Sequence, residues 1–264
     1  MKPFGVLEPT LIFVEIRPAS LHAWTGLAGV DLPLERGPDG RLTGAATAAA
    51  TAALQTLVPA KGWMSRARVC CAIGSRGVLL RPIVLPVTAP AEVPRLLQLK
   101  IEGEFPLPPD ALAWGWSPLL APAPSDATSP RQGVLVAAVK KEVIEEYAAI
   151  IGPIDPDPIF AVAALVRPAL VPIDQRAFAV LDVGPTQSEL TLLDAAFPPT
   201  VQLLPWGENR LLERLGATLS QSREEVLAAI ASFQSHTHPA RNDALESALD
   251  EAVRPLISSL PAAA

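Results

Sequence analysis

The stretch LIFVEIRPASLHAW at Leu11–Trp24 has a counterpart, AVLDVGPTQSELTL, at Ala179–Leu192. In both stretches an apolar strand ends near an acidic residue, a turn containing proline follows, and a second strand returns. Glu15 of the first stretch corresponds to Asp182 of the second. Two such hairpins far apart in one chain predict a duplicated α/β fold with a cleft between its halves, in which each turn can face a phosphate chain.

The rest of the chain also follows strand and helix periods. Strands are predicted over 11–16, 20–28, 30–35, 68–73, 77–85, 111–119, 132–139, 177–182, 189–194 and 200–204. Helices are predicted over 45–58, 92–104, 141–151, 159–170, 209–219, 223–233 and 242–259. The turn at 74–77 is interpreted as a hairpin between its flanking strands, and the charges of 140–146 as a solvated helix face. This order of elements predicts mixed sheets flanked by helices.

The 264 residues suffice for one large domain or two modest ones. We predict a first half over 8–175, which carries an inserted small α/β subdomain over 88–158. A second half follows over 176–264. Because it lacks the last strands and helix of a full duplicate, we expect it to be incomplete at its C-terminus.

Composition excludes several classes of function. A net charge of −6 argues against nucleic acid as the main partner, because phosphate binding needs an excess of Lys and Arg. The 50% content of hydrophobic residues argues against disorder, yet no segment offers the roughly 18 uncharged apolar residues of a membrane span. The first residues lack the apolar core of a signal peptide. We therefore expect a cytoplasmic protein with no membrane span in this chain.

Cysteine and histidine offer little chemistry here. Cys70 and Cys71 are neighbours in a strand, so their side chains point to opposite faces and are predicted to be buried, reduced thiols. His22, His236 and His238 are too scattered for a Ser/His/Asp or Cys/His site. No further ligands stand near the last two for a metal ion. Any catalysis would therefore depend on carboxylates and bound water.

Five stretches in a fixed order carry a resemblance to a known family. They are VLLRPIVLP at 78–86, EGEFPLP at 102–108, GVLVAAVKKEVIEEY at 133–147, the second hairpin at 179–194, and WGEN at 206–209. Their order resembles the actin-like ATPase superfamily, in particular the PilM-type proteins of type IV pilus assembly, which are similar to FtsA. The cytoplasmic domain of the type II secretion protein GspL is a more divergent relative. The resemblance covers about 11–260, but the family's final adenosine-binding Gly-Gly-Gly segment has no counterpart.

The resemblance implies an actin-like (ribonuclease H-like) fold, with 8–175 as subdomain 1A and 88–158 as a subdomain 1C. It also implies a site for ATP with Mg²⁺, with Asp182 positioned to hold the ion through water. The implied nucleotide-binding residues are Glu15, Arg17, Ser20, Asp182, Gly184, Thr186, Gln187 and Gly207.

Both turns depart from the family pattern. Arg17 stands where the family has a glycine, and Pro18 and Pro185 each remove a backbone N–H from a turn. Glu208 would repel a phosphate at the following helix. The competing interpretation is two ordinary hairpins, with Arg17 in solvent and Asp182 capping its turn.

Preserved architecture with degraded phosphate turns favours a scaffold of a type IV pilus or type II secretion platform, peripheral to the bacterial inner membrane. In PilM-type proteins the cleft between subdomains 1A and 1C receives the N-terminal tail of the membrane protein PilN. The resemblance therefore implies that 78–147, against the first sheet, docks a PilN-like tail. The alternative is an ATP-binding protein or slow ATPase of the same fold. A sugar-kinase-type activity would need a catalytic Asp in a substrate loop, which the sequence does not locate.

Overall fold

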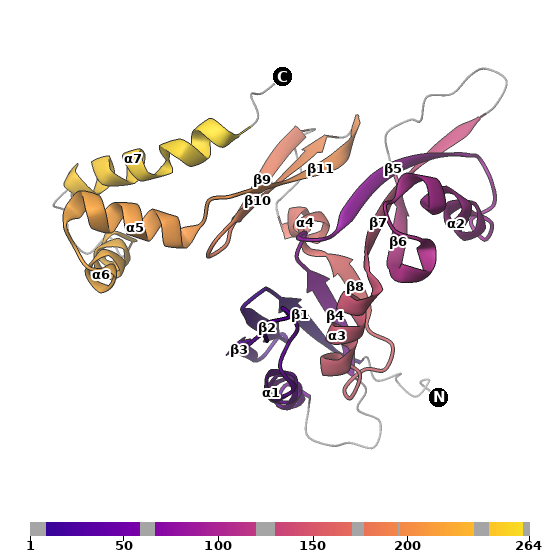
Figure 1. Ribbon diagram of the computed structural model, residues 1–264, viewed down its shortest axis with the longest axis horizontal. Coiled ribbons are helices and arrows are strands. Elements are labelled where there is room, and N and C mark those ends of the chain that lie inside the picture. Colours follow the sequence, from indigo (N-terminus) through magenta and orange to yellow (C-terminus); the bar gives the residue numbers. More distant parts are fainter. Residues whose placement is uncertain are drawn as a thin grey trace, which may run out of the picture. The chain divides into compact units, whose positions relative to one another are not determined.

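The computed structural model describes residues 9–58, 67–119, 130–170, 177–194, 196–234 and 243–260 (Figure 1). The chain divides into two compact units. The first comprises Met1–Phe178 with Leu193–Thr200, and the second comprises Ala179–Leu192 with Val201–Ala264. Each unit has apolar cores of its own.

A mixed five-stranded sheet forms the base of the first unit. Its order is β3-β2-β1-β4-β8, with β1 at Thr10–Ile16, β2 at Ser20–Trp24, β3 at Gly29–Pro33, β4 at Ala67–Ile73 and β8 at Ile159–Val162. Strands β1, β2 and β3 are antiparallel neighbours, whereas β4 runs parallel to both β1 and β8. The predicted mixed sheet is therefore present.

One face of this sheet carries the main core of the first unit. Alternate residues of a strand point to the same face, and those of β1 and β4 on this face are buried: Ile12, Val14, Ile16, Val69, Cys71 and Ile73. Helices α1 (Gly44–Gln55) and α3 (Lys141–Ile151) add Leu54, Ile150 and Ile151 to the same cluster. Both helices therefore cover one side of the sheet, and residues such as Phe13 and Trp24 on the other side stay exposed.

The strands on either side of residues 74–77 do not pair with each other, so the predicted hairpin is wrong. Strand β4 belongs to the five-stranded sheet, while β5 (Leu79–Pro86) belongs to a separate three-stranded sheet. The turn itself is present, because the Val78 N–H donates to the Ser75 carbonyl and Gly77 adopts a φ of 81°. Turn residues show where a strand ends but not which strand it pairs with. The partner of β4 was decided by seven parallel residue pairs with the distant β1.

The three-stranded sheet has the order β5-β7-β6, with β6 at Leu112–Pro118 and β7 at Arg131–Lys140, and its neighbours are antiparallel. Helix α2 (Val93–Glu104) covers one face, and a short 3-10 helix, η1 (Pro109–Ala111), leads into β6. Leu97 and Ile101 of α2 pack there with Val134 and Val136 of β7. The sheet and α2 together span 79–140, so β5 precedes the subdomain boundary that we placed at residue 88.

Residues 159–170 form three short elements, so the predicted helix is wrong here. They are β8, α4 (Ala163–Val166) and the 3-10 helix η2 (Arg167–Leu170). Periodicity cannot distinguish a short apolar strand from a buried helix. The open edge of β4 decided the outcome, because it pairs Phe160 with Cys71 and Val162 with Ile73.

Glu146 of α3 makes tertiary contacts, so the prediction of a solvated face is wrong for this residue. Its carboxylate accepts from Arg36 Nη1 at 3.2 Å and from the Leu42 N–H at 2.5 Å. Arg36 also donates through Nε to the Pro18 carbonyl at 2.8 Å. The ion pair therefore ties the β1–β2 turn and the loop after β3 to α3.

The second unit contains most of a three-stranded sheet, followed by three helices. Strands β9 (Ala177–Val183), β10 (Ser188–Asp194) and β11 (Phe197–Leu204) have the order β11-β10-β9. Helices α5 (Glu208–Leu219), α6 (Arg223–Gln234) and α7 (Asp243–Ser259) share a core that includes Leu215, Val226 and Leu245. Across the described residues, none of the helices has both the length and the apolar character that a membrane crossing requires.

A buried carboxylate fixes the start of β4 and yields a test of this fold. Asp155 is 3% exposed and accepts from the N–H groups of Val69 at 2.8 Å and Asp157 at 3.1 Å. Asp155→Ala leaves the Val69 N–H without this acceptor, so we expect the free energy of unfolding in urea to fall by about 2 kcal/mol. Asp157→Ala, at a side chain that is 92% exposed, should cost less than about 0.5 kcal/mol. Equal losses in the two variants would contradict the assignment.

Candidate functional site

The carboxylate of Glu15, near the end of β1, is held by two arginines. Arg17 Nη2 donates to Oε2 at 3.2 Å, and Arg167 Nη2 donates to Oε1 at 2.6 Å. Arg17 follows β1 directly, whereas Arg167 comes from η2, 152 residues beyond Glu15. No local feature of the sequence points to Arg167, because only the pairing of β8 with β4 brings η2 to this place.

The arginines also set the charge of this cluster. Burial alone would raise the pKa of Glu15, but the hydrogen bonds and positive charges of Arg17 and Arg167 outweigh it and hold the pKa below its ordinary value. Glu15 is therefore ionised at neutral pH and already paired. Each guanidinium thereby stabilises the ionised form of this carboxylate.

Ser20, His22 and Asp31 form a hydrogen-bonded chain that the sequence analysis did not anticipate. Ser20 and His22 alternate along β2, and His22 lies directly opposite Asp31 on β3 and Glu15 on β1. Ser20 Oγ is 2.9 Å from His22 Nε2, and Asp31 Oδ1 is 2.5 Å from His22 Nδ1. The available signal was the two-residue spacing of Ser20 and His22 within one strand.

The direction of these hydrogen bonds depends on the tautomer of His22. In a neutral imidazole whose proton is on Nδ1, the Nδ1–H group donates to Asp31 and Nε2 accepts from the Ser20 hydroxyl. Nucleophilic catalysis would also need donors for a developing oxyanion. The Asp31 side chain is 81% exposed, so water competes for its bond to His22. We interpret the arrangement as a cross-strand link that orients Ser20 beside Arg17, whose N–H donates to the Ser20 carbonyl at 2.8 Å.

In the second unit, the β9–β10 turn lies against the start of α5. The N–H groups of Glu208 and Asn209 donate to the carbonyl oxygens of Gly184 and Pro185, both at 2.9 Å. These are the first two amides of the helix, the groups that could bind an anion at a helix N-terminus. In this conformation the turn already uses them.

The next two amides of α5 are satisfied as well. The N–H groups of Arg210 and Leu211 both donate to the Gly207 carbonyl at 3.1 Å. All four initial amides of the helix therefore have acceptors within the chain. A phosphate could reach them only if the turn moved away.

Gly207 makes the close approach of turn and helix possible. A Cβ atom at this position would lie 2.5 Å from the Gly184 carbonyl oxygen and 2.8 Å from the Gln187 nitrogen. The turn itself is closed by the Gly184 N–H, which donates to the Gln187 carbonyl at 3.1 Å. Three of the predicted nucleotide-binding residues thus have a packing role, and their role towards nucleotide stays a prediction.

Asp182 and Thr186 belong to the same hairpin. Asp182 is half-buried near the end of β9, and Thr186 is exposed in the turn. Within the described parts of the chain, no three or more His, Cys, Asp or Glu residues group in a way that could hold a metal ion. Mg²⁺ is often bound by one or two carboxylates together with phosphate oxygens. Asp182 therefore fits Mg²⁺ only as a single carboxylate ligand of a nucleotide-bound ion, and this role stays a prediction.

The predicted site residues fall into two groups. Glu15, Arg17 and Ser20 lie together on the first unit, while the hairpin residues and Gly207 lie together on the second. Each group is closed by its own partners, the first by Arg167 and the second by α5. Neither turn presents a row of free backbone amides of the kind that cradles a phosphate chain.

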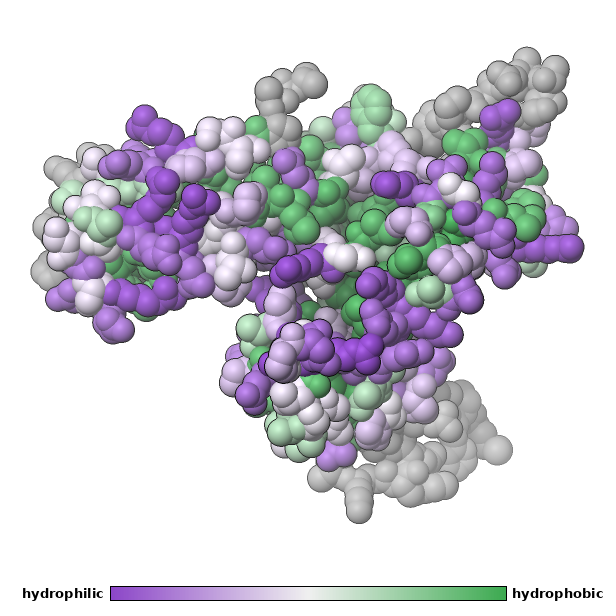
Figure 2. All heavy atoms as spheres, in the orientation of Figure 1, coloured by the Kyte–Doolittle hydropathy of each residue, from purple (hydrophilic) through white to green (hydrophobic). Residues whose placement is uncertain are grey.

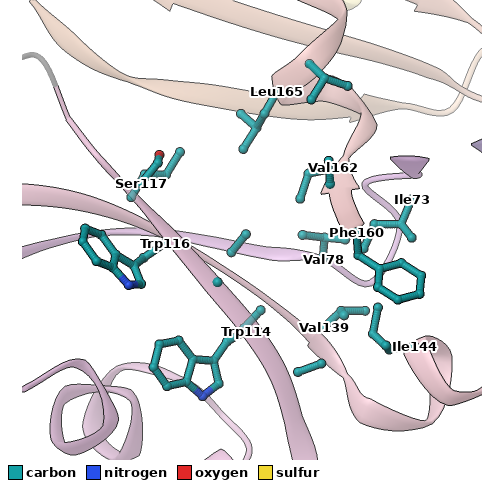
Figure 3. A pocket seen from close by; sticks show the side chains of 17 residues that line it. Ile73, Val78, Trp114, Trp116, Ser117, Val139, Ile144, Phe160, Val162 and Leu165 are labelled. Atoms are coloured by element: carbon teal, nitrogen blue, oxygen red, sulfur yellow. The ribbon is translucent and has the colours of Figure 1, made fainter. Parts of the chain in front are cut away.

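A groove of 520 Å³ lies between the two sheets of the first unit (Figure 3). Strands β6 and β7 line one side, and β8 and α4 line the other. None of the described residues that line it is charged, and Ser117, Trp114 and Trp116 are the lining residues whose side chains carry a polar group. Figure 2 shows hydrophobic residues at the surface in the region of β7. The groove therefore suits an apolar ligand.

The groove exists because one face of the small sheet has only partial cover. Helix α2 packs on the face that carries Val134 and Val136. On the opposite face, Val139 joins the main core, while Leu135 and Ala137 line the groove. The family resemblance implied a cleft between 78–147 and the first sheet. The wall formed by 160–166 was not predicted, because this segment was interpreted as a buried helix.

No protein-family model matches this sequence, and no curated protein matches it significantly. Among solved structures, the PilM–PilN type IV pilus biogenesis complex is similar over 94% of this chain and 73% of that chain, at 20% identity and a TM-score of 0.60. The cytoplasmic domain of EpsL, from the type II secretion system of Vibrio cholerae, is similar over 73% of this chain and 70% of its own, at 9% identity and a TM-score of 0.45. The ethanolamine utilization protein EutJ of Carboxydothermus hydrogenoformans is similar over 97% of this chain and 70% of its own, at 10% identity and a TM-score of 0.46.

The first of these likenesses shows the fold. The chain has an actin-like α/β fold, and its predicted resemblance to PilM-type proteins is confirmed at this level. At 20% identity the likeness extends to the architecture alone.

Substitution of Gly207 tests the packing of the second turn on α5. Gly207→Ala places a Cβ atom 2.5 Å from the Gly184 carbonyl oxygen, so we expect a loss of about 2 kcal/mol in the free energy of unfolding. Gly103→Ala in α2 is the matched control, because a Cβ there meets no atom within 4 Å. It should be neutral or raise stability by about 0.5–1 kcal/mol. A neutral Gly207→Ala variant would show that turn and helix are not in contact.

The pairing of Glu15 predicts a defined pH dependence. Its folded-state pKa is lower than its unfolded-state pKa, so its contribution to stability is present above the unfolded-state pKa and is lost as the pH falls through the folded-state value. We expect Glu15→Gln to lower the free energy of unfolding at neutral pH and the difference from wild type to shrink in acid. Urea denaturation across this range measures both. A difference that does not change with pH would rule out the ionised pairing.

Proposed function

We propose that this chain is an actin-like scaffold on the cytoplasmic face of the bacterial inner membrane. It docks on the platform of a type IV pilus or type II secretion system and holds the tail of a membrane partner in the groove between its two sheets. The observation that carries the proposal is this uncharged groove of 520 Å³. A protein partner is supported by the similar solved structure, which is a complex of PilM with PilN.

The groove suits a peptide better than a nucleotide. A nucleotide needs cationic or amide donors for its phosphates, and the described lining residues include no arginine or lysine. Ala137 and Ala138 of β7 and Val162 of β8 offer apolar contact from both walls. Apolar side chains of a bound tail would gain free energy by leaving water.

The nucleotide site is degenerate in this proposal. The first turn holds a carboxylate that Arg17 and Arg167 neutralise. The second turn is packed on α5 and occupies the amides that begin the helix. Binding a phosphate chain would cost the free energy of breaking these contacts, whereas binding a tail in the groove leaves them intact.

Nucleotide binding remains a second candidate function on one observation. Asp182, half-buried near the end of β9, offers one carboxylate of the kind that Mg²⁺ takes together with the phosphate oxygens of ATP.

Filling the groove tests the docking function. A Cβ atom at Gly115 of β6 meets nothing within 4 Å, so Gly115→Val adds apolar volume to the groove wall from an unhindered position and with a favourable strand propensity. We expect the wild-type chain to recover a single-pass inner-membrane protein and a pilus or secretion ATPase from solubilised membranes of its own organism, read by mass spectrometry. A synthetic peptide of that protein's cytoplasmic tail should then bind Gly115→Val about tenfold more weakly, or ~1.4 kcal/mol.

The matched control is Gly103→Ala, on a helix outside the groove, where an added Cβ is also unhindered. It should recover the same membrane protein as wild type. If neither the wild-type chain nor Gly103→Ala recovers a platform protein, the scaffold function is overturned. Equal binding of the tail peptide to wild type and Gly115→Val would place the docking surface elsewhere.

A thermal-shift experiment separates the two candidate functions. Because the turn amides are already used, we expect ATP with Mg²⁺ to leave the Tm unchanged. A Mg²⁺-dependent increase in Tm that Asp182→Ala abolishes would instead establish nucleotide binding.

A further inference from the structure

Strand β6 presents its backbone edge to the groove. Five consecutive residues of this strand, 113–117, line the groove. Successive side chains of a strand point to opposite faces, so a groove that faced only one side of β6 would be lined by every second residue. Because all five residues line it, the backbone edge of β6 is itself exposed to the groove. In the strand order β5-β7-β6, β6 pairs only with β7 among the strands that the structure describes. Its other edge is therefore open to a further strand.

The register with β7 shows which backbone groups point outward. Just past β6, the Leu119 N–H donates to the carbonyl of Gly133 at 2.9 Å, and the two positions continue the register that pairs Pro118 with Val134. Directly opposed residues of an antiparallel pair alternate between hydrogen-bonded and non-hydrogen-bonded. Residues 113, 115 and 117 therefore bond to β7, while Trp114 and Trp116 direct their N–H and C=O groups to the open edge. Pro118 belongs to the same outward-facing set as Trp114 and Trp116. A proline is tolerated there because this position donates no hydrogen bond to β7.

The side chains next to this edge leave room for another chain. Trp114 and Trp116 pack towards α2, and Figure 3 shows them on one side of β6 with Ser117 on the other. The alternate positions that face away from α2 hold Ala113, Gly115 and Ser117, which are all small. No charged residue of β6 blocks the approach of a strand, although charges are a common protection of open edges.

We propose that the groove takes its occupant, an extended and uncharged peptide segment of a protein partner, as a fourth strand on β6. This proposal rests on the docking function given above and specifies how the tail is held. The N–H and C=O groups of Trp114 and Trp116 pair with the backbone of the peptide. Alternate side chains of the peptide enter the apolar groove towards β8 and α4. Backbone pairing supplies affinity, and the small residues at 113, 115 and 117 leave space for the inserted side chains.

Amide exchange on the intact chain tests this mode of binding. The probes are peptides selected on the wild-type chain from a random phage library and retained only if they fail to bind Gly115→Val. NMR then follows hydrogen exchange of the β6 amides with and without peptide. At a peptide concentration about ten times Kd, exchange of the Trp114 and Trp116 amides should slow about tenfold. The amides of Gly115 and Ser117, already bonded to β7, should change little.

A second measurement uses the peptide backbone. Methylation of alternate peptide nitrogens should abolish binding in one phase and leave it nearly unchanged in the other, because only every second N–H faces β6. Selection of no groove-dependent peptide would overturn the proposal. Protection spread evenly over β6, or equal effects of both methylation phases, would overturn it as well. In the latter two cases a membrane partner recovered with the wild-type chain would still support the docking function.

Discussion

The parallel pairing of β1 with β4 is the interaction on which the first unit depends. Seven consecutive residue pairs, from Thr10 with Ala67 to Ile16 with Ile73, join strands that are far apart in the sequence. The pairing aligns the apolar side chains of both strands on the face that α1 and α3 cover. It also leaves β4 one open edge, which β8 fills, so β5 joins a different sheet. The groove follows from this separation, because the two sheets meet along only part of their surfaces.

Each of the two hairpins has a packing role within its own unit. In the first, a carboxylate that would repel phosphate is neutralised by Arg17 and by Arg167. In the second, the carbonyl groups of the turn cap α5, and Gly207 is small enough to permit the contact. Each set of contacts stabilises its own unit and uses the polar groups that a nucleotide would need. A scaffold that binds a peptide elsewhere on the first unit is compatible with both.

Local pattern predicted the elements better than their partners. The bounds of α3 at Lys141–Ile151 agree with the prediction, because its apolar face and the following glycine are encoded within the segment itself. The pairing of the strands around 74–77 and the strand at Ile159–Val162 were missed, because both depend on which edge is open after β1 and β4 combine. The link between Ser20, His22 and Asp31 was missed for a similar reason, since it requires the register of β2 with β3. Arg167 could not be predicted at all, as no local feature relates it to Glu15.

By itself the sequence determined most of the strands and helices, the two related hairpins with a proline in each turn, and the apolar character of the segments that line the groove. These properties depend on the backbone preferences and polarity of neighbouring residues. Tertiary structure alone decided which strands pair, which arginines neutralise Glu15, that the start of α5 is capped by the second turn, and that β6 keeps an open edge beside the groove. The physical reason is that strand pairing and ion pairing join residues that are distant in the chain. The register between distant strands depends on the whole set of buried apolar side chains rather than on any single segment.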